Sequence, residues 1–565
     1  MWETSQRMSS RVFYGPARMH AKEPELDRVA EIPGLRNLHE VTLTDLKPNT
    51  RYFYQVVSTR AGGYELRSPV YSFKTAVPAD GPFAFGLVGD SQDNPQVWGE
   101  ISTALWKERP DFVLHAGDLV GQGMKKTDWT EEFFPPAQEL MSRTPVFTVL
   151  GNHEQDARHY YNYFHNPYPE YYYSFYYGNA KFILVDSNRP LNEGSQQYTW
   201  LEWELANDTA EWTFVMHHHP VYSSDENDYG DTWNGLSRRG DPAVEDLAPL
   251  YERYDVDFVF AGHIHNYERT WPIRNNQVDM KNGVRYLVVG GAGGGLENWS
   301  PSRNWFAKKL LNNHHYGLFM VHKNHLTYQA FDREGRLFDQ LELTKPRRTL
   351  RSPQAYAPPA PMFSVLGRKF QDSLKVELHK PFPDLEIRYT TNGTEPNRFS
   401  SLYTDPLYLT ETTTLSIRTF WPNGKGSRTN KATYTKAELK EGVAVANPHP
   451  GLDVAYYEGA WKQLPNFANL KPLKMGVAKD IRLEVMETAD DQFAYRFTGF
   501  LKVDTAGLYE FYTNSDDGTK LLLHGQVVVD NDGSHGAITK SGRMLLGPGL
   551  HPFELQYFED YGGVF

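Results

Sequence analysis

The sequence predicts a multidomain protein in which an α/β domain built from βαβ units is flanked at both ends by all-β sandwich domains. The 565 residues suffice for several domains, because a single domain usually holds about 100–200 residues. Stretches in which apolar and polar residues alternate occupy both ends of the chain, whereas apolar strands alternate with helical segments in the middle. The alternation of strands and helices indicates a largely parallel sheet.

The N-terminal part, residues 1–78, is predicted to be a β-sandwich. Residues 40–54 alternate apolar and polar side chains around a turn at Pro48-Asn49, which is typical of paired strands. Several short strands between turns favour a sandwich. The chain opens directly with the strand-like residues 11–15, and no signal peptide is visible at Met1, so we expect this end to be truncated.

The central part, residues 80–347, carries the α/β pattern. Strands are predicted at 83–89, 111–117, 145–150, 182–186, 213–216 and 256–260, and helices at 96–108 and 131–142. In sheets of this kind functional side chains lie on loops just past the carboxyl ends of the strands. We therefore expect the catalytic or ligand-binding residues just after these strands.

The C-terminal part is predicted to be all-β again. A Pro-rich linker at 348–361 is followed by two strand-rich segments, 362–438 and 451–565, with a break near Asn447-Pro448. Clusters of turn residues interrupt the second segment at 516–518 and 530–533. The chain stops just after Tyr561, where a further strand is expected, so we expect truncation at this end as well.

The composition excludes several classes of protein. A net charge of −12 argues against a nucleic-acid scaffold, whose surface would be basic. No run of about 18 apolar residues is present, so no membrane span is predicted. The absence of cysteine excludes disulfides and thiolate metal sites, and it leaves His, Asp and Asn as the available metal ligands.

Five short polar motifs follow predicted strand ends. They are Gly89-Asp90, Gly117-Asp118, Gly-Asn-His-Glu at 151–154, His-His-His-Pro at 217–220 and Gly-His-Ile-His at 262–265. Any one of them alone would be read as an ordinary turn, but five in order on one βαβ framework predict a shared site. Glycine permits the close backbone approach that such a site needs, and a mixture of oxygen and imidazole ligands suits Zn, Mn or Fe.

The order of these motifs resembles the signature of the calcineurin-like metallophosphoesterases over about residues 80–345. This likeness implies a four-layer α/β sandwich for the central domain. Residues 262–269, Gly-His-Ile-His-Asn-Tyr-Glu-Arg, and residues 173–179, with Tyr-Ser-Phe, resemble the purple acid phosphatase branch. The N-terminal segment is similar to the fibronectin-type-III-like domain that precedes the catalytic domain in that branch.

The resemblance implies six metal ligands that form two sites with one shared carboxylate. The first site comprises Asp90, Asp118 and His265, and the second comprises Asp118, Asn152, His218 and His263. His218 is chosen within the triple His because the family's ligand lies two residues before the proline, and His217 is the alternative.

Three further residues receive roles outside the ligand set. The resemblance implies that His153 stabilises the transferred phosphate or protonates the leaving oxygen. His219 and Asn94 are candidates for contact with the substrate. No Ser or Cys nucleophile stands out in the sequence, and none is needed for this chemistry.

The reaction implied is the hydrolysis of phosphate esters, phosphomonoesters first, on a small phosphorylated substrate. Two cations of the Fe, Zn or Mn class about 3.5–4 Å apart would hold the phosphate and lower the pKa of a trapped water. A metal-bound hydroxide would then attack phosphorus without a phospho-enzyme. Phosphodiester or nucleotide hydrolysis uses the same centre and is the alternative.

The sequence departs from the purple enzymes at the first metal site. Their iron-binding tyrosine is replaced here by Gly121, and the wider superfamily's histidine two residues after the first Asp is replaced by Gln92. We therefore predict that the protein is not purple and that its metal need not be ferric iron. The carbonyl oxygen of Gln92, or water, is a candidate for an additional ligand.

The substrate side of the site departs from the plant enzymes as well. Their substrate-facing histidines are absent from the matching stretch, 225–229. Arg238 or Arg239 could line the pocket instead, or the stretch is a solvated loop.

The C-terminal segments resemble accessory modules. Residues 362–438 are similar to the chitobiase/hexosaminidase C-terminal β-sandwich, and residues 451–565 to the protective-antigen-like β-sandwich of glycosidases and adhesins. In some relatives of the latter an Asp pair binds calcium and sugar, and this pair would fall on Asp516-Asp517; the alternative is a turn between strands.

These modules predict an exported protein, in the periplasm, on the cell surface or outside the cell, that works near polysaccharide or a cell-surface glycan. A carbohydrate-binding surface protein with a decayed phosphoesterase domain is a competing hypothesis. The changes at positions 92 and 121 favour it, and the otherwise intact ligand set opposes it.

Overall fold

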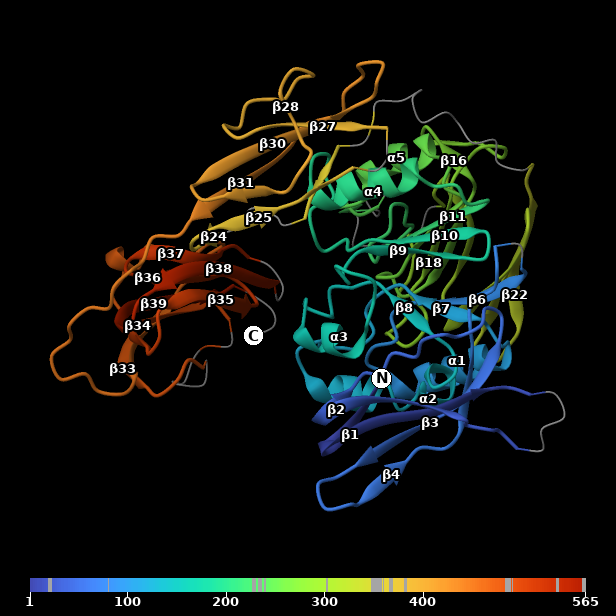
Figure 1. Cartoon of the computed structure of the whole chain (residues 1–565), viewed down its shortest axis with the longest axis horizontal. Helices are drawn as coiled ribbons and strands as arrows, with labels where there is room; N and C mark the ends of the chain where they lie inside the picture. Colours follow the sequence, from blue (N-terminus) through green and yellow to red (C-terminus); the bar gives the residue numbers. More distant parts are fainter. Residues whose placement is uncertain are drawn as a thin grey trace. The chain divides into compact units, whose positions relative to one another are not determined.

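The computed structural model (Figure 1) divides into two compact units, Met1–Pro359 and Ala360–Phe565, each of which is described by itself. The structure describes residues 1–18, 23–79, 81–225, 230–231, 236–237, 240–300, 303–346, 358, 360–364, 369–380, 384–482, 489, 491–534 and 538–560. Most of the predicted linker at 348–361, residues 226–229, and Arg238 and Arg239 lie outside these residues.

The first unit begins with an antiparallel sheet of five strands. These are β1 (Trp2–Pro16), β2 (Arg28–His39), β3 (Arg51–Thr59), β4 (Glu65–Arg67) and β5 (Tyr71–Lys74). They follow the order β2-β1-β3-β4, and β5 also pairs with β3. One face buries Val12, Tyr14 and Tyr52, which is the half-buried pattern expected from the alternating sequence.

Two sheets form the framework of the α/β domain. The first has the order β22-β21-β20-β6-β7-β8 and contains β6 (Phe83–Val88), β7 (Phe112–His115), β8 (Val146–Thr148), β20 (His315–His322), β21 (His325–Asp332) and β22 (Leu337–Thr344). The second has the order β19-β15-β18-β14-β11-β10-β9 and contains β9 (Tyr173–Tyr177), β10 (Ala180–Leu184), β11 (Trp212–Met216), β14 (Phe258–Ala261), β15 (Tyr267–Thr270), β18 (Arg285–Val289) and β19 (Ala307–Leu311).

The strands that lead to the motifs are parallel within each sheet. β6, β7 and β8 run parallel in the first sheet, and β10, β11, β14 and β18 run parallel in the second. Parallel strands present their carboxyl ends at one edge of the sheet. Two short two-stranded sheets lie outside these large sheets. One pairs β12 (Gly230–Asp231) with β13 (Leu236–Ser237), and the other pairs β16 (Ile273–Arg274) with β17 (Gln277–Val278).

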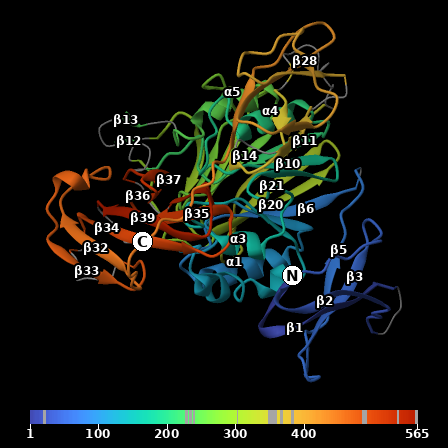
Figure 2. The ribbon, with the colours of Figure 1, turned by 60° about the vertical axis from the view of Figure 1, so that its left-hand side comes forward.

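An aromatic core lies between the two sheets. The ring of Phe85 in β6 lies 5.2 Å from that of Phe214 in β11 and 4.7 Å from that of Phe319 in β20. Figures 1 and 2 show the sheets packed face to face, with α4 (Gln196–Ala206) and α5 (Ala248–Arg253) outside the second sheet and α1 (Pro95–Lys107) and α2 (Gln138–Met141) outside the first. This arrangement confirms the predicted four-layer architecture.

A buried ion pair ties the two sheets together. Arg269 on β15 donates from Nε to Asp339 Oδ2 at 2.6 Å and from Nη2 to Oδ1 at 2.7 Å, and Asp339 lies on β22. Tyr267 adds a third hydrogen bond to the same carboxylate at 2.7 Å. Burial alone would raise the pKa of Asp339, but these donors hold it below its ordinary value.

One predicted helix is wrong. The sequence favoured a single helix over 131–142, whereas the structure has a π-helix at Asp128–Phe133 and a separate short helix, α2. Pro135 and Pro136 lie between them and lack the backbone N–H that a continuous helix requires. A further short helix, α3 (Arg158–Tyr163), follows the Gly-Asn-His-Glu motif.

The second unit is built of strands, as predicted. Its first part contains β23 (Met362–Phe363), β24 (Lys369–Phe370), β25 (Leu374–Val376), β26 (Leu378–His379), β27 (Glu386–Thr390), β28 (Ser401–Leu402), β29 (Leu407–Leu409), β30 (Thr413–Phe420) and β31 (Asn430–Lys436). These strands enclose a core that includes Val376, Leu415 and Tyr434.

The last part of the chain forms a six-stranded sheet, β33-β32-β34-β39-β36-β37, and a pair, β35-β38. The strands are β32 (Leu452–Glu458), β33 (Lys474–Ala478), β34 (Phe493–Val503), β35 (Gly507–Ser515), β36 (Thr519–Leu523), β37 (Gln526–Asn531), β38 (Ile538–Leu546) and β39 (Gly549–Glu559). Among the residues that the structure describes, no helix is long and apolar enough to cross a membrane.

Candidate metal centre

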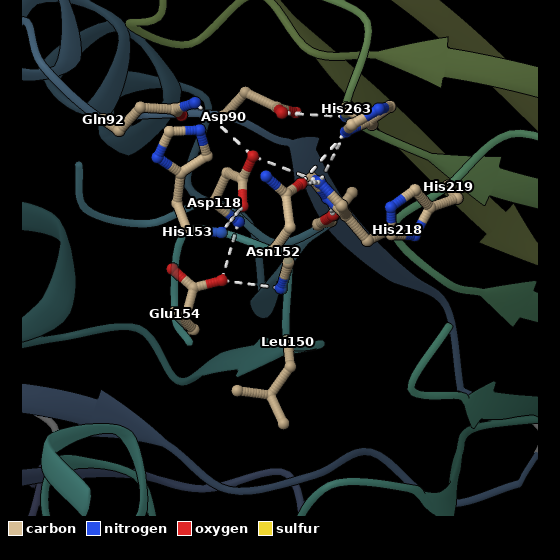
Figure 3. A network of polar contacts seen from close by, with 12 residues as sticks. Asp90, Gln92, Asp118, Leu150, Asn152, His153, Glu154, His218, His219 and His263 are labelled. Atoms are coloured by element: carbon tan, nitrogen blue, oxygen red, sulfur yellow. Dashed lines mark hydrogen bonds and ion pairs between the residues drawn. The ribbon is translucent and has the colours of Figure 1, made fainter. Parts of the chain in front are cut away.

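All five motifs lie on loops that directly follow strands. Asp90 follows β6, Asp118 follows β7 and Asn152 follows β8, while His218 follows β11 and the Gly-His-Ile-His motif follows β14. The first three strands belong to one sheet and the last two to the other. Figure 3 shows that the motif side chains from both sheets point toward one another.

The backbone at three of the six predicted ligands is strained. Asp90, Asp118 and His263 have φ angles of 59°, 52° and 70°, a region that costs a non-glycine residue about 1–3 kcal/mol. Such strain persists only where the surroundings enforce it, and it concentrates at functional sites. Its recurrence at three predicted ligands indicates that these loops are shaped for the site.

Glycines allow the motif loops to approach one another. A Cβ at Gly262 would lie 2.2 Å from Asp90 Oδ2, and a Cβ at Gly151 would lie 2.1 Å from Asp118 Oδ1. Neither position has room for a side chain, which is the close approach that the sequence predicted for the glycines.

The predicted second site is a tight group of polar atoms. His218 Nε2 lies 3.1 Å from both Asp118 Oδ2 and Asn152 Oδ1, and His263 Nδ1 lies 3.1 Å from Asn152 Oδ1. The two imidazole nitrogens are 3.3 Å apart. Atoms that bind one cation at about 2.1 Å have separations of this order, so the group fits a metal ion.

The predicted first site lies beside it. Asp90 Oδ1 accepts a hydrogen bond from the backbone N–H of His263 at 2.8 Å and lies 3.6 Å from His265 Nε2. Asp90 is fully buried, and its Oδ2 has no hydrogen-bond partner among the described residues. A buried carboxylate oxygen without a partner is costly, and a cation would satisfy it.

The pKa values reflect two carboxylates among imidazoles in a buried space. Burial raises the pKa of Asp90 to about 7. Burial would also raise the pKa of Asp118, but the adjacent His218 holds it well below its ordinary value. Conversely, Asp118 outweighs burial and raises the pKa of His218 to about 10, while burial and His218 lower that of His263 to about 3. Without a metal, a proton on His218 balances the carboxylate charge.

Backbone carbonyls orient three of the imidazoles. The Nδ1–H groups of His218, His265 and His153 donate to the carbonyl oxygens of Ala116, Gly295 and Gly121 at 2.8, 2.8 and 2.7 Å. Because a carbonyl only accepts, Nδ1 carries the proton and Nε2 presents its lone pair in the neutral ring. Contacts of this kind fix the tautomer of metal-binding histidines.

Glu154, the last residue of its motif, has a role that the sequence did not reveal. Its buried carboxylate accepts the backbone N–H of Asp118 at 2.9 Å and of Gly151 at 2.6 Å through Oε2, and that of Leu119 at 2.7 Å through Oε1. It thereby locks the Asp118 loop to the Asn152 loop. Burial and the neighbouring Asp118 raise the pKa of Glu154 to about 7.

Asn188 is a second supporting residue that the sequence analysis missed. It follows β10, and its Nδ2 donates to the carbonyl oxygens of Leu150 and Gly151 at 3.2 and 3.3 Å and to Asp186 Oδ1 at 2.9 Å. These contacts hold the backbone that precedes Asn152. The sequence carries no sign of this role beyond the position of Asn188 after a strand.

His219 lies beside the predicted ligands, because ligand atoms of His218, His219 and His263 lie within 4.8 Å of one another. His219 Nδ1 is 2.8 Å from Ser187 Oγ, and its ring centroid lies 4.5 Å from that of His263. His217 is buried, donates to the carbonyl oxygen of His219 at 2.7 Å and stacks on Tyr251, so it turns away from the ligand cluster.

Asn94 and the Asp516-Asp517 pair have structural contacts. The Oδ1 atom of Asn94 accepts the backbone N–H of Val97 at 3.2 Å and caps helix α1. Asp517 is buried between β35 and β36, and its Oδ2 accepts the backbone N–H of Asp560 at 2.6 Å.

Comparison with known proteins places these features in families. Four family models match the chain: Calcineurin-like phosphoesterase at residues 83–267, Purple acid Phosphatase, N-terminal domain at 1–75, Chitobiase/beta-hexosaminidase C-terminal domain at 366–431, and PA14 domain at 448–564. Each agrees with a resemblance seen in the sequence.

Individual relatives come from the same group. The chain is 30% identical over 275 residues to "Purple acid phosphatase 21" of Arabidopsis thaliana, covering 45% of this chain and 58% of the relative. It is 27% identical over 352 residues to "Probable inactive purple acid phosphatase 27" of the same plant, covering 54% and 55%. The chain thus spans little more than half the length of these curated relatives.

A solved structure shares the fold. The purple acid phosphatase PPD1 from yellow lupin (Lupinus luteus) seeds matches with a TM-score of 0.52 and 20% identity, covering 61% of this chain and 73% of that chain. The chain therefore carries a calcineurin-like phosphoesterase domain at residues 83–267, with a match to the purple acid phosphatase N-terminal domain before it and matches to the chitobiase C-terminal and PA14 domains after it.

Proposed function

We propose that the chain is a metal-dependent phosphoesterase with a binuclear centre, and that phosphomonoesters are its preferred substrates. The observation that carries the proposal is the meeting of Asp90, Asp118 and His218 at ligand distance from one another, where Asp90 Oδ2 is buried and has no hydrogen-bond partner in the part of the chain that the structure describes. Sets of this kind with perturbed pKa values are typical of catalytic metal sites.

In this proposal the six predicted residues hold two cations and Asp118 is shared. When bound, the cations would polarise the phosphoryl group and lower the pKa of a trapped water. The first would be held by Asp90, Asp118 and His265. The second would be held by Asp118, Asn152, His218 and His263. The iron, zinc or manganese class suits these ligands.

His153 is proposed to act on the substrate. Its Nδ1–H donates to the carbonyl of Gly121, so Nε2 is the ring atom that remains to meet a phosphate oxygen or the leaving oxygen. Asp118 outweighs burial and raises the pKa of His153, so the ring can carry a second proton on Nε2, and the imidazolium then donates to charge that develops on phosphate. The neighbouring loop contributes His219, which lies beside His263 and is proposed to contact the substrate.

Two competing hypotheses differ in what they predict. Phosphodiester or nucleotide hydrolysis would use the same centre, and the shape of the substrate pocket would decide between monoester and diester substrates. A decayed domain is suggested by the relative named as inactive and by Gln92 and Gly121, but it would not require the strained backbone at Asp90 and Asp118 to be retained.

The test is a comparison of p-nitrophenyl phosphate with bis(p-nitrophenyl) phosphate after loading with Mn²⁺, Zn²⁺ or Fe. We expect faster turnover of the monoester, and Asp118→Asn should reduce it to the rate without enzyme while the fold remains. A faster diester reaction would favour the alternative. Equal inactivity of wild type and Asp118→Asn in every metal would refute the proposal.

The PA14 domain carries a second candidate function, the binding of calcium and through it of sugar. Glu559 is buried, its Oε1 lacks a hydrogen-bond partner among the described residues, and burial together with Asp517 and Asp516 raises its pKa to about 7. Carboxylate oxygens of this kind suit Ca²⁺. Such binding would fit an exported protein that works near polysaccharide.

Calorimetric titration of the full chain with Ca²⁺, followed by a glycan array, tests this second function. We expect Asp517→Asn to lose calcium binding and glycan binding together. Equal calcium affinity of wild type and Asp517→Asn would contradict it.

A further inference from the structure

We propose that Gln92 is a fourth protein ligand of the first metal site and that its neutral oxygen makes this site selective for a divalent cation. The inference rests on the proposed binuclear centre and adds a residue and a metal preference to it. Its basis is the position of one buried amide, whose oxygen has no hydrogen-bond partner among the residues that the structure describes.

Gln92 lies in the loop after β6, two residues beyond Asp90, and its side chain is completely buried. Its Oε1 atom has no hydrogen-bond partner among the described residues. A buried amide oxygen without a partner lowers the stability of the fold by about 1–3 kcal/mol. A bound cation would remove this penalty by accepting Oε1 as a ligand.

The amide end lies at ligand spacing from two predicted ligands. Gln92 Nε2 is 3.2 Å from His265 Nε2 and 3.5 Å from Asp118 Oδ2 (Figure 3 shows Gln92 above Asp118). Two atoms that share a cation at about 2.1 Å are about 3.0 Å apart at right angles and about 3.4 Å apart in a tetrahedron. The terminal atom of Gln92 therefore occupies a ligand position.

His265 explains why the nitrogen faces inward in this structure. Its Nδ1–H donates to the carbonyl of Gly295, so Nε2 presents a lone pair to which the Gln92 NH₂ group donates. Nitrogen and oxygen of an amide have the same shape. A half-turn of the amide places Oε1 at the same point, where it binds a cation together with the lone pair of His265.

The charge of the site determines which cation it prefers. With Gln92 and His265 neutral, only Asp90 and the shared Asp118 bring negative charge to the first cation. Position 121 adds no anionic ligand, because it is a glycine. Two carboxylates, an imidazole and an amide oxygen match a divalent ion such as Mn²⁺ or Zn²⁺.

The experiment measures metal binding rather than turnover. Gln92→Leu removes the ligand and keeps an apolar stem, Gln92→Glu replaces the amide by an anionic oxygen, and Gln96→Leu is the matched control because Gln96 lies exposed on α1. Each protein is stripped of metal, its fold is checked by circular dichroism, and Mn²⁺ and Zn²⁺ binding is measured by calorimetry and elemental analysis.

We expect wild type and Gln96→Leu to bind two ions. Gln92→Leu should keep one and bind the other at least about tenfold more weakly, because even loss of a contact one shell further out costs about 10–100-fold. Gln92→Glu should keep both and raise the affinity for Fe³⁺ relative to Mn²⁺. Two ions at wild-type affinity in Gln92→Leu would overturn the inference.

Two further results keep the test decisive. If Gln92→Leu does not fold, Gln92→Glu carries the test, and an unchanged Fe³⁺ to Mn²⁺ preference in it overturns the inference. Wild type that binds two ions but hydrolyses no phosphate ester refutes the proposed function alone, so the two failures are distinguishable.

Discussion

Gly294 packs so closely against the imidazole of His265 that a single methyl group would displace the ring. A Cβ at this position would lie 2.6 Å from His265 Cε1, 2.8 Å from Nδ1 and 2.9 Å from Nε2, whereas ordinary contact begins at 3.4 Å. In Gly294→Ala the ring must therefore give way by about 0.8 Å. Metal–ligand distances tolerate shifts of only about 0.2 Å.

We expect Gly294→Ala to weaken the first cation by about 10–100-fold and to leave the second unchanged. The matched control is Gly295→Ala, because a Cβ at the next residue would meet nothing within 4 Å. Neither glycine has a left-handed φ, so alanine strains the backbone at neither position. Calorimetric titration with Zn²⁺ measures both affinities, and the melting temperature of the metal-free proteins reports the fold.

The reasoning is refuted if Gly294→Ala binds both ions as wild type does. It is also refuted if Gly295→Ala loses the first ion to the same extent, because the effect would then come from the loop and not from contact with His265.

Three further substitutions test the contacts that support the site. Asp339→Asn leaves the guanidinium of Arg269 buried without its counter-charge, so we expect a loss of about 3–5 kcal/mol in the free energy of unfolding, measured by urea denaturation. Because the pKa of Asp339 is lowered from 3.8 in the folded state, the stabilisation should be complete above that pH and fade as the pH falls below it; a difference between wild type and variant that persists in strong acid would contradict this. Glu154→Gln turns an amide NH₂ group toward backbone N–H donors, one of them on Gly151, and should cost about 1–3 kcal/mol in the same assay, whereas wild-type stability would show that the carboxylate does not hold the loops. Asn188→Ala should weaken the second cation by about tenfold or more while its melting temperature changes little, and unchanged affinity would show that the second site does not depend on this contact.

The sequence could predict which residues would lie together, because these residues are local features of strand ends. Asp90, Asp118 and Asn152 each follow an apolar strand, and the strand order alone places them at one edge of a parallel sheet. The structure brings these residues together with His218 and His263 from the second sheet. A motif in which a polar residue follows a glycine at a strand end can be identified from the sequence alone.

What the sequence could not predict depends on contacts between distant segments. Glu154, Asn188 and Gly294 support ligands through backbone groups or bare van der Waals contact, and no local pattern marks such a role. The side chain of Asn94, a candidate for contact with the substrate, caps α1, a use typical of Asn at a helix start.

The helix expected at 131–142 failed for a different reason. Its apolar spacing is helical, but Pro135 and Pro136 divide it, and the weight of a proline pair exceeds that of periodicity.

Anomalous diffraction from crystals soaked in Mn²⁺ tests the central claim most directly. We predict two peaks about 3.5–4 Å apart, one beside Asp90 and His265 and the other beside Asn152, His218 and His263, with Asp118 between them. A single peak, or two peaks that do not share Asp118, would contradict the binuclear centre.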